Sequence, residues 1–309
     1  MDARALAACL AGLSMPWALL ALAISVPQVA LSAYRWRLTA SRLGIELPFL
    51  VAWREYYLAA FLNQVLPSGW LGDASRAWRH SRSDAEGRVG PAVRAVMIER
   101  MSGQVVMGVV AALSLASMPI AFGPAPRAWL LTVVGICAVA VTWLVIARSL
   151  RRYGRWRDDG LLASFWRDVR TALLAWDVLA VQLGTSALVV GSYLATYLVA
   201  ARAVGVDTPF ATLLPLVAPV LQSMLIPVSL AGWGVREVTA AGVWVAVGLS
   251  AADGVAISAT YGLVVLMASL PGAVVLIISG RGRTGHPRPC TRGGTSVAAR
   301  APGSGSAAG

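Results

Sequence analysis

The sequence contains no lysine, only two histidines and three cysteines, and few charged residues of any kind. Charged residues make up 13% of the 309 residues and hydrophobic residues 58%, whereas soluble domains are about 25% charged. So few polar side chains cannot cover a water-exposed surface, which excludes a soluble catalytic domain as the main body of the protein. Cys9, Cys137 and Cys290 lie far apart in the sequence, so neither a disulfide framework nor a metal site is supported.

The sequence is instead rich in long apolar runs. A helix needs about 20 apolar residues to cross a hydrocarbon core about 30 Å thick. Five runs predict full membrane spans: 17–34, 101–122, 129–147, 177–200 and 254–279. The sequence therefore predicts an all-α polytopic integral membrane protein, with a transmembrane domain over residues 1–280. Residues 281–309 are rich in Gly, Ser, Pro and Arg and predict a disordered basic tail.

The net charge of +12 comes entirely from arginine. The arginines flank the apolar runs instead of forming one face of a soluble module, so no nucleic-acid partner is expected. We interpret them as topology signals and as contacts to anionic lipid headgroups. The positive-inside rule then places residues 148–170 and the tail in the cytoplasm, together with residues 35–42 and 76–94. The weakly charged segments 123–128 and 202–210 are expected outside.

Two further apolar stretches do not fit as simple crossings. Residues 48–66 have cytoplasmic flanks on both sides, which favours a re-entrant hairpin, and residues 210–249 favour a second hairpin that enters from the outside. Each hairpin tip has a side-chain amide, a proline, a Gly-Trp break, an acid and an arginine. The predicted breaks are Pro67, Gly69, Gly72, Pro227, Gly232 and Gly234. Matched breaks of this kind are typical of inverted-topology transporters, so residues 12–122 and 176–280 are possible repeats; the alternative is chance similarity.

Charged residues close to apolar runs are costly in a membrane and therefore indicate candidate functional sites. Asp73 and Arg76 lie one turn apart if a helix begins near Gly72, so they are expected to pair. An arginine next to a glycine-broken helix start suits a lipid phosphate, because its guanidinium donates in a planar fork. The candidates for headgroup binding are Asn63, Asp73, Arg76, Glu99, Arg100, Arg236 and Glu237.

The alternative for every one of these charges is an ion pair that stabilises the fold, or a side chain that extends to the membrane surface. The same alternative applies to Arg35 and Arg37, at the end of the first predicted span. His80 is expected to be a solvated side chain in a basic loop. The sequence has no nucleophile elbow, zinc-protease motif or phosphate loop, so we expect no enzymatic activity, no metal and no cofactor.

Several short motifs follow one another in order: Arg35-Trp36-Arg37, Phe61-Leu62-Asn63 with Leu66-Pro67, Gly72-Asp73 with Arg76, Glu99-Arg100, and Gly232-Trp233-Gly234-Val235-Arg236-Glu237. As an ordered set they resemble the lysylphosphatidylglycerol synthase transmembrane-region family over roughly residues 15 to 280. Leu71 departs from the pattern, which has a glycine at this position. In that family the membrane region stands alone or precedes a soluble aminoacyl-transfer domain.

The resemblance implies a flippase-like protein of the bacterial inner membrane, with its C-terminal tail in the cytoplasm. Its expected substrate is an anionic or modified phospholipid or a lipid-linked headgroup. The alternative function is a non-transporting membrane subunit that docks or regulates a separate lipid-modifying enzyme. An intramembrane enzyme is the third alternative, and the missing catalytic motifs disfavour it.

Overall fold

The computed structural model describes residues 12–66, 70–83, 89–118, 160–225 and 232–281. Within these ranges all regular elements are helices: α2 (Met15–Arg42), α3 (Phe49–Val65), α4 (Leu71–Ser83), α5 (Val89–Ser117), α7 (Leu161–Ala172), α8 (Trp176–Ala203), α9 (Phe210–Gln222), the 3-10 turn η1 (Ser223–Leu225), α10 (Val235–Ala246) and α11 (Ala251–Arg281). The all-α prediction is confirmed for this part of the chain.

Four helices are long and apolar enough to cross a membrane: Met15–Arg42, Val89–Ser117, Trp176–Ala203 and Ala251–Ser279. Each has 28 or 29 residues and rises about 42 Å, more than the hydrocarbon thickness of about 30 Å. They coincide with four of the five predicted spans. The fifth predicted span, 129–147, and the predicted tail beyond residue 281 lie outside the described residues. The chain is a multi-pass membrane protein.

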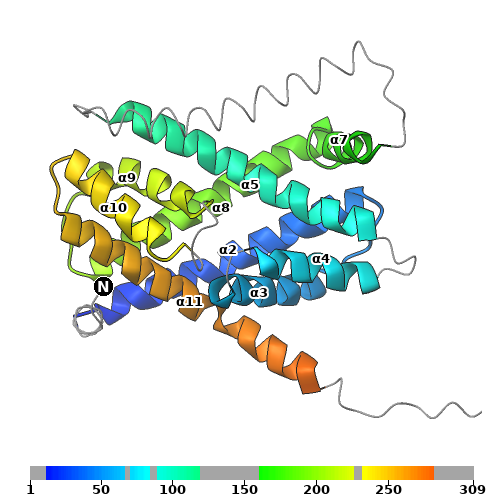
Figure 1. Cartoon of the computed structure of the whole chain (residues 1–309), viewed down its shortest axis with the longest axis horizontal. Coiled ribbons are helices and arrows are strands. Elements are labelled where there is room, and N and C mark those ends of the chain that lie inside the picture. The colour runs from blue at the N-terminus through cyan, green and yellow to red at the C-terminus, as the bar shows by residue number, and fades with distance from the viewer. Residues whose placement is uncertain (1–11, 67–69, 84–88, 119–159, 226–231, 282–309) are drawn as a thin grey trace, which may run out of the picture.

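The helices α2 and α8 are antiparallel neighbours. At one end the backbone N–H of Ser14 donates to the carbonyl oxygen of Ala203 (2.8 Å), and at the other end Arg42 forms an ion pair with Asp177. The pair runs through the length of the molecule (Figure 1). Contacts at both ends fix the two helices in opposite directions.

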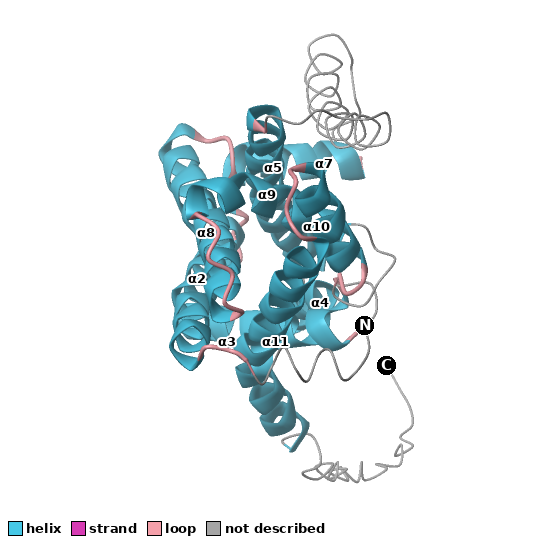
Figure 2. Cartoon of the chain, turned by 90° about the vertical axis from the view of Figure 1, so that its left-hand side faces the viewer, coloured by secondary structure: helices cyan, strands magenta, loops and turns pink. Residues whose placement is uncertain are grey.

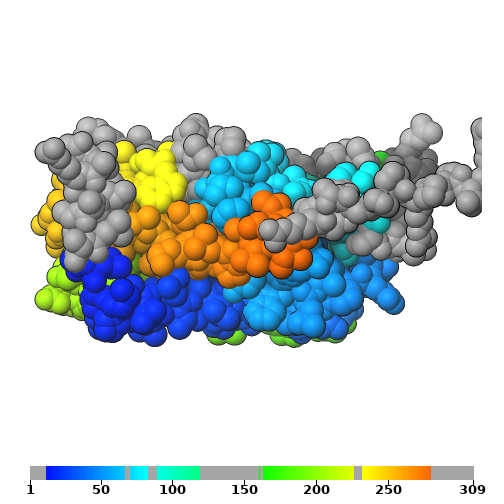
Figure 3. All heavy atoms as spheres, turned by 90° about the horizontal axis from the view of Figure 1, so that it is seen from below, coloured from blue at the N-terminus to red at the C-terminus, as the bar shows by residue number. Residues whose placement is uncertain are grey.

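The shorter helices form two pairs at opposite ends of this framework. The pair α3 and α4 lies toward the end where α2 finishes, and the pair α9 and α10 lies toward the other end (Figure 1). Viewed from that other end, α2 and α8 form one side of the molecule and α10 and α11 the opposite side (Figure 2). From below, α11 packs along α2 and α3 (Figure 3).

Each helix pair has its own apolar core. Around Trp36, α3 and α4 pack against α2 and α5. Around Tyr197 and Trp244, α9 and α10 pack against α5, α8 and α11. The helix α5 therefore belongs to both cores and connects them.

Two glycines permit unusually close contacts to α3. A Cβ atom at Gly72 of α4 would lie 2.1 Å from the carbonyl oxygen of Ala59, and one at Gly272 of α11 would lie 2.1 Å from the carbonyl oxygen of Tyr57. Both distances are far below van der Waals contact, so a larger residue at either position requires the helices to separate.

The two halves of the chain also match in their first long helix and in the turn after it. The starts of α2 and α8, at residues 15 and 176, and their ends, at 42 and 203, are both 161 residues apart. Gly44 and Gly205 follow at the same separation with φ values of 73° and 79°, the left-handed conformation that suits glycine at a helix end. Pro48 and Pro209 then precede α3 and α9 at the same separation.

Candidate functional site

A group of buried charges lies where α2, α4 and α5 meet, next to α3. We call it the first cluster; it consists of Arg35, Asp73, Arg76, Glu99 and Arg100. Arg76 is 0% exposed, and Arg35 and Glu99 are each 2% exposed. The sequence had suggested that Arg35, Glu99 and Arg100 lie at the ends of membrane spans. The structure places them inside helices instead, because α2 continues beyond the first predicted span and α5 begins before the second.

Arg76 is at the centre of the first cluster. Its Nη2 atom lies 2.7 Å from Oε2 of Glu99 and 3.1 Å from Oδ1 of Asp73. The Asp73–Arg76 pairing predicted from the sequence is therefore confirmed. The guanidinium carbon lies 4.7 Å from the ring centroid of Trp36 and 4.5 Å from that of Tyr56, a geometry that adds cation–π attraction. These contacts fix Arg76 in the protein interior.

Asp73 connects the start of α4 to α3 and α5. Its Oδ2 atom accepts hydrogen bonds from Nε of Arg100 (2.7 Å) and from Nδ2 of Asn63 (3.1 Å), and Arg100 Nη2 pairs with the same oxygen. The Oδ1 atom of Asn63 accepts a hydrogen bond from the backbone N–H of Gly72 (2.8 Å), near the start of α4. Two arginines and the Asn63 amide therefore surround the Asp73 carboxylate.

Arg35 reaches the first cluster from α2. Its Nη2 atom donates to the carbonyl oxygen of Glu99 (2.8 Å) and to Oγ of Ser102 (2.5 Å), and its Nη1 atom lies 3.8 Å from the Glu99 carboxylate. The Tyr56 hydroxyl also donates to this carboxylate (3.5 Å). Arg35 therefore stabilises the α2–α5 contact, as the ion-pair alternative proposed.

The charges of the first cluster do not balance. Three arginines face two carboxylates, which leaves one positive charge in excess. The side chain of Arg100 is 39% exposed, so it is the accessible cation of the group. Within the described residues, Nε and Nη1 of Arg76 have no hydrogen-bond partner. A cluster with a surplus positive charge favours an anion, and the geometry of a guanidinium suits a phosphate or a carboxylate.

The second cluster consists of Arg236 and Glu237 of α10 with Ser258 of α11. Nη2 of Arg236 lies 2.7 Å from Oε1 of Glu237, and its Nε atom donates to Oγ of Ser258 (2.9 Å). Oε2 of Glu237 accepts the backbone N–H of Gly234 (2.5 Å) and thereby caps α10,. One cation faces one anion, so the second cluster is neutral.

Aromatic rings and a close helix contact surround Arg236 of the second cluster. Arg236 is 2% exposed, and its guanidinium carbon lies 5.3 Å from the ring centroid of Trp233 and 5.4 Å from that of Tyr261. A Cβ atom at Gly262 would lie only 2.3 Å from Nη2 of Arg236. The arginine therefore occupies the space that a side chain at Gly262 would fill, and the arrangement is typical of a structural ion pair.

The predicted hairpin breaks are only partly within the described residues. Gly72 is the second residue of α4, while Gly232 and Gly234 have φ values of 82° and 87° before α10. This left-handed conformation explains the glycines of the second tip. Pro67, Gly69 and Pro227 lie outside the described residues.

The prediction for His80 is wrong. The residue is 5% exposed on α4, and its ring packs edge-to-face against Trp36 with 5.4 Å between the ring centroids. Sequence reasoning also missed Tyr56, Ser102 and Ser258 as partners of the buried arginines. Their spacing within each helix carries no signal, because the contacts come from different helices. In the described ranges no three His, Cys, Asp or Glu residues are grouped as a metal site requires.

The chain was compared with known protein families, curated proteins and solved structures. Residues 1–272 match the sequence profile of the family described as "Lysylphosphatidylglycerol synthase TM region". No curated protein and no solved structure gives a significant match.

Proposed function

Because the chain belongs to the lysylphosphatidylglycerol synthase transmembrane-region family, we propose that it moves a phosphate-bearing lipid between the leaflets of a bacterial inner membrane, with the headgroup held at the first cluster. The surplus positive charge of that cluster and the exposure of Arg100 carry the proposal. An unbalanced cation in a membrane protein is costly, and an anionic headgroup would remove the imbalance.

The substrate in this proposal is an anionic or modified phospholipid, or a lipid-linked headgroup with a phosphate. The phosphate approaches Arg100 and shares its guanidinium with Asp73, which already accepts two hydrogen bonds from it. Arg76, Arg35 and Glu99 hold this arrangement in place, since their side chains are buried. Asn63 positions Asp73 and the start of α4.

The arrangement of the helices supports an inverted repeat in the same proposal. The helices α2 and α8 are antiparallel and have equal length, and each is followed by the same turn and a proline. The next helices, α3 and α9, have 17 and 13 residues, which rise about 25 and 20 Å and are short for a full crossing. We therefore interpret α3–α4 and α9–α10 as re-entrant hairpins from opposite sides.

The orientation follows from the arginines in this proposal. The end of the molecule with Arg42, Arg94, Arg167 and Arg170 faces the cytoplasm, and the C-terminal tail lies on the same side. The first hairpin then enters from the cytoplasm and the second from the outside.

Reconstitution of the purified protein tests the proposal. In liposomes that contain a fluorescent phosphatidylglycerol, the protein alone should accelerate the exchange of label between leaflets, as measured by a reductant that quenches only the outer leaflet. Liposomes with a labelled phosphatidylethanolamine, at the same protein density, provide the comparison with a zwitterionic headgroup. Movement no faster than in protein-free liposomes contradicts the translocase proposal. It would favour the alternative, a non-transporting subunit that acts with a separate lipid-modifying enzyme.

A further inference from the structure

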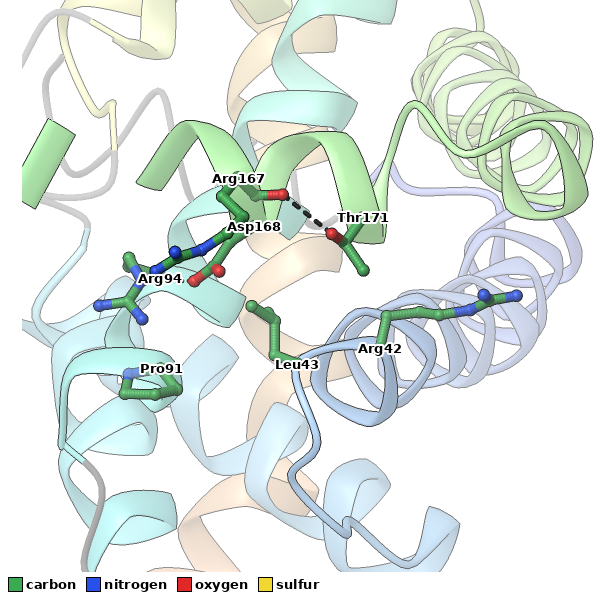
Figure 4. Close-up of a pocket in the computed structure, with 7 residues that line it drawn as sticks. All are labelled: Arg42, Leu43, Pro91, Arg94, Arg167, Asp168 and Thr171. Carbon is green, nitrogen blue, oxygen red and sulfur yellow. Dashed lines mark hydrogen bonds and ion pairs between the residues drawn. The ribbon is translucent and has the colours of Figure 1, made fainter. Parts of the chain in front are cut away.

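A second group of arginines lies outside the first cluster, where α7 meets the ends of α2 and α5. They line a cavity of about 200 Å³ together with Leu43, Pro91 and Thr171 (Figure 4). Arg42 comes from the end of α2, Arg94 from α5 and Arg167 from α7. The volume exceeds that of several water molecules, at about 30 Å³ each, but is below the roughly 300 Å³ of a typical small-molecule pocket. It suits a headgroup and not a whole lipid.

The charges around this cavity leave one cation without a counter-charge. Nε of Arg94 lies 2.5 Å from Oδ2 of Asp168, and Arg42 pairs with the more exposed Asp177. In Figure 4 the guanidinium of Arg42 extends away from Arg94 and Asp168. Arg167 is exposed and has no carboxylate partner among the described residues. Three arginines against two aspartates make the junction positive by one charge.

The helix α7 has the character of a helix at a membrane surface. Trp166 and Val169 are buried against Ile98 of α5, whereas Arg167 and Arg170 are exposed. These arginines stand beside the ends of α2 and α5, two candidate membrane spans, where arginines are attracted to anionic headgroups. The cavity beneath α7 is therefore at the depth of lipid phosphates, next to the ends of two candidate spans.

We propose that this cavity binds the phosphodiester of an anionic lipid from the surrounding leaflet, separately from the first cluster. Arg167 supplies the unpaired guanidinium. Arg94 supplies a second one, because among the described residues its bond to Asp168 engages only Nε. The bound headgroup connects α7 to α2 and α5, so its role is to hold this junction together, and the lipid is not transported. An inorganic phosphate ion shares the same chemistry, and the experiment separates the two.

Amide hydrogen exchange of α7 in the full-length protein tests the site. We compare nanodiscs of phosphatidylcholine with nanodiscs that also contain phosphatidylglycerol. The anionic lipid should slow exchange in α7 of the wild-type protein. Arg167→Gln should reduce this protection, because one lost arginine weakens binding on the order of fivefold. The matched control is Arg170→Gln, which removes an exposed arginine of the same helix that does not line the cavity; it should retain the protection.

Each other outcome contradicts the proposal. Equal protection in the wild-type protein and Arg167→Gln indicates a general surface-charge effect. Equal protection by phosphatidylcholine nanodiscs with added inorganic phosphate indicates an ion site instead of a lipid site. No protection by phosphatidylglycerol removes the site altogether. Arg100→Gln should leave the protection of α7 unchanged, so a failure of the transport proposal does not affect this test.

Discussion

The first and second clusters both place a buried arginine beside an acid near the start of a short helix, yet only the first has a cation in excess. Arg76 shares its acids with two further arginines, whereas Arg236 has Glu237 as its carboxylate partner among the described residues. A buried arginine is therefore a poor sign of a binding site by itself. The balance of charge around it distinguishes a site that favours an anion from a pair that stabilises the fold.

The long helix beside each cluster explains why only the first cluster has a surplus cation. Asp73 and Glu237 are both the third residue of their helix. In the first half α5 presents Glu99 and Arg100, and the Asp73 carboxylate turns to Arg100. In the second half α11 presents Ser258, and Glu237 turns back to cap its own helix. The same local design thus yields an open charged site in one half and a closed neutral pair in the other.

The largest expected effect on stability is that of Arg76→Gln. This change leaves the carboxylates of Asp73 and Glu99 without their shared buried partner and removes two cation–π contacts. Removing one member of a buried charge group costs about 3–5 kcal/mol. Thermal unfolding in detergent should show this loss, while Arg82→Gln, an exposed arginine on the same helix, should change stability by less than about 1 kcal/mol. Equal stability of the two variants contradicts the central role of Arg76.

A double-mutant cycle in each half sharpens the comparison. Arg236→Gln alone should cost about 3 kcal/mol, and Arg236→Gln with Glu237→Gln should cost clearly less, because the pair is neutralised as a unit. In the first half, Asp73→Asn should not rescue Arg76→Gln, because Asp73 also neutralises Arg100. Chemical unfolding of the six variants measures both coupling energies. Equal coupling in the two halves removes the distinction between the clusters.

An alanine in place of the glycine at the helix start should destabilise the first half more than the second. Gly72→Ala places a Cβ atom 2.1 Å from a backbone oxygen, and such overpacking costs about 1–3 kcal/mol. Gly234→Ala meets no atom within 4 Å and costs only the left-handed conformation, about 1–2 kcal/mol. We expect Gly72→Ala to unfold at the lower temperature. Gly90→Ala, at the start of α5, faces only the flexible end of Arg94 and serves as a control.

Part of this account was accessible from the sequence. The apolar runs predicted four helices that the structure contains, and the spacing of Asp73 and Arg76 predicted their ion pair. The motifs predicted the family, which the profile match confirms. The burial of Arg35 and Glu99 was not accessible, because hydropathy ends a span at a charge, whereas the helices continue and pair these charges with other helices. The burial of His80 was not accessible either, because its contact with Trp36 comes from another helix.

One signal was present in the sequence and was missed. Residues 43–49 and 204–210 share the order aliphatic, glycine, aliphatic, acid, any residue, proline, phenylalanine, at a separation of 161. The comparison of the hairpin tips overlooked it because the tips themselves align with different gaps. The turn after a long helix constrains the backbone, through a left-handed glycine and a fixed proline, and therefore retains its pattern better than the tip.

The smallest expected change in stability belongs to Arg100→Gln, and this variant tests the central claim most directly. Its side chain is 39% exposed, so the free energy of unfolding should fall by about 1 kcal/mol or less. In liposomes with labelled phosphatidylglycerol, its translocation rate should fall at least about tenfold, because a charge-assisted hydrogen bond contributes about 1.5–3 kcal/mol. Arg100→Lys should restore little, since lysine lacks the planar fork, and Arg82→Gln should translocate like the wild-type protein. A wild-type rate for Arg100→Gln, at equal incorporation, would contradict the assignment of the surplus cation to the lipid headgroup.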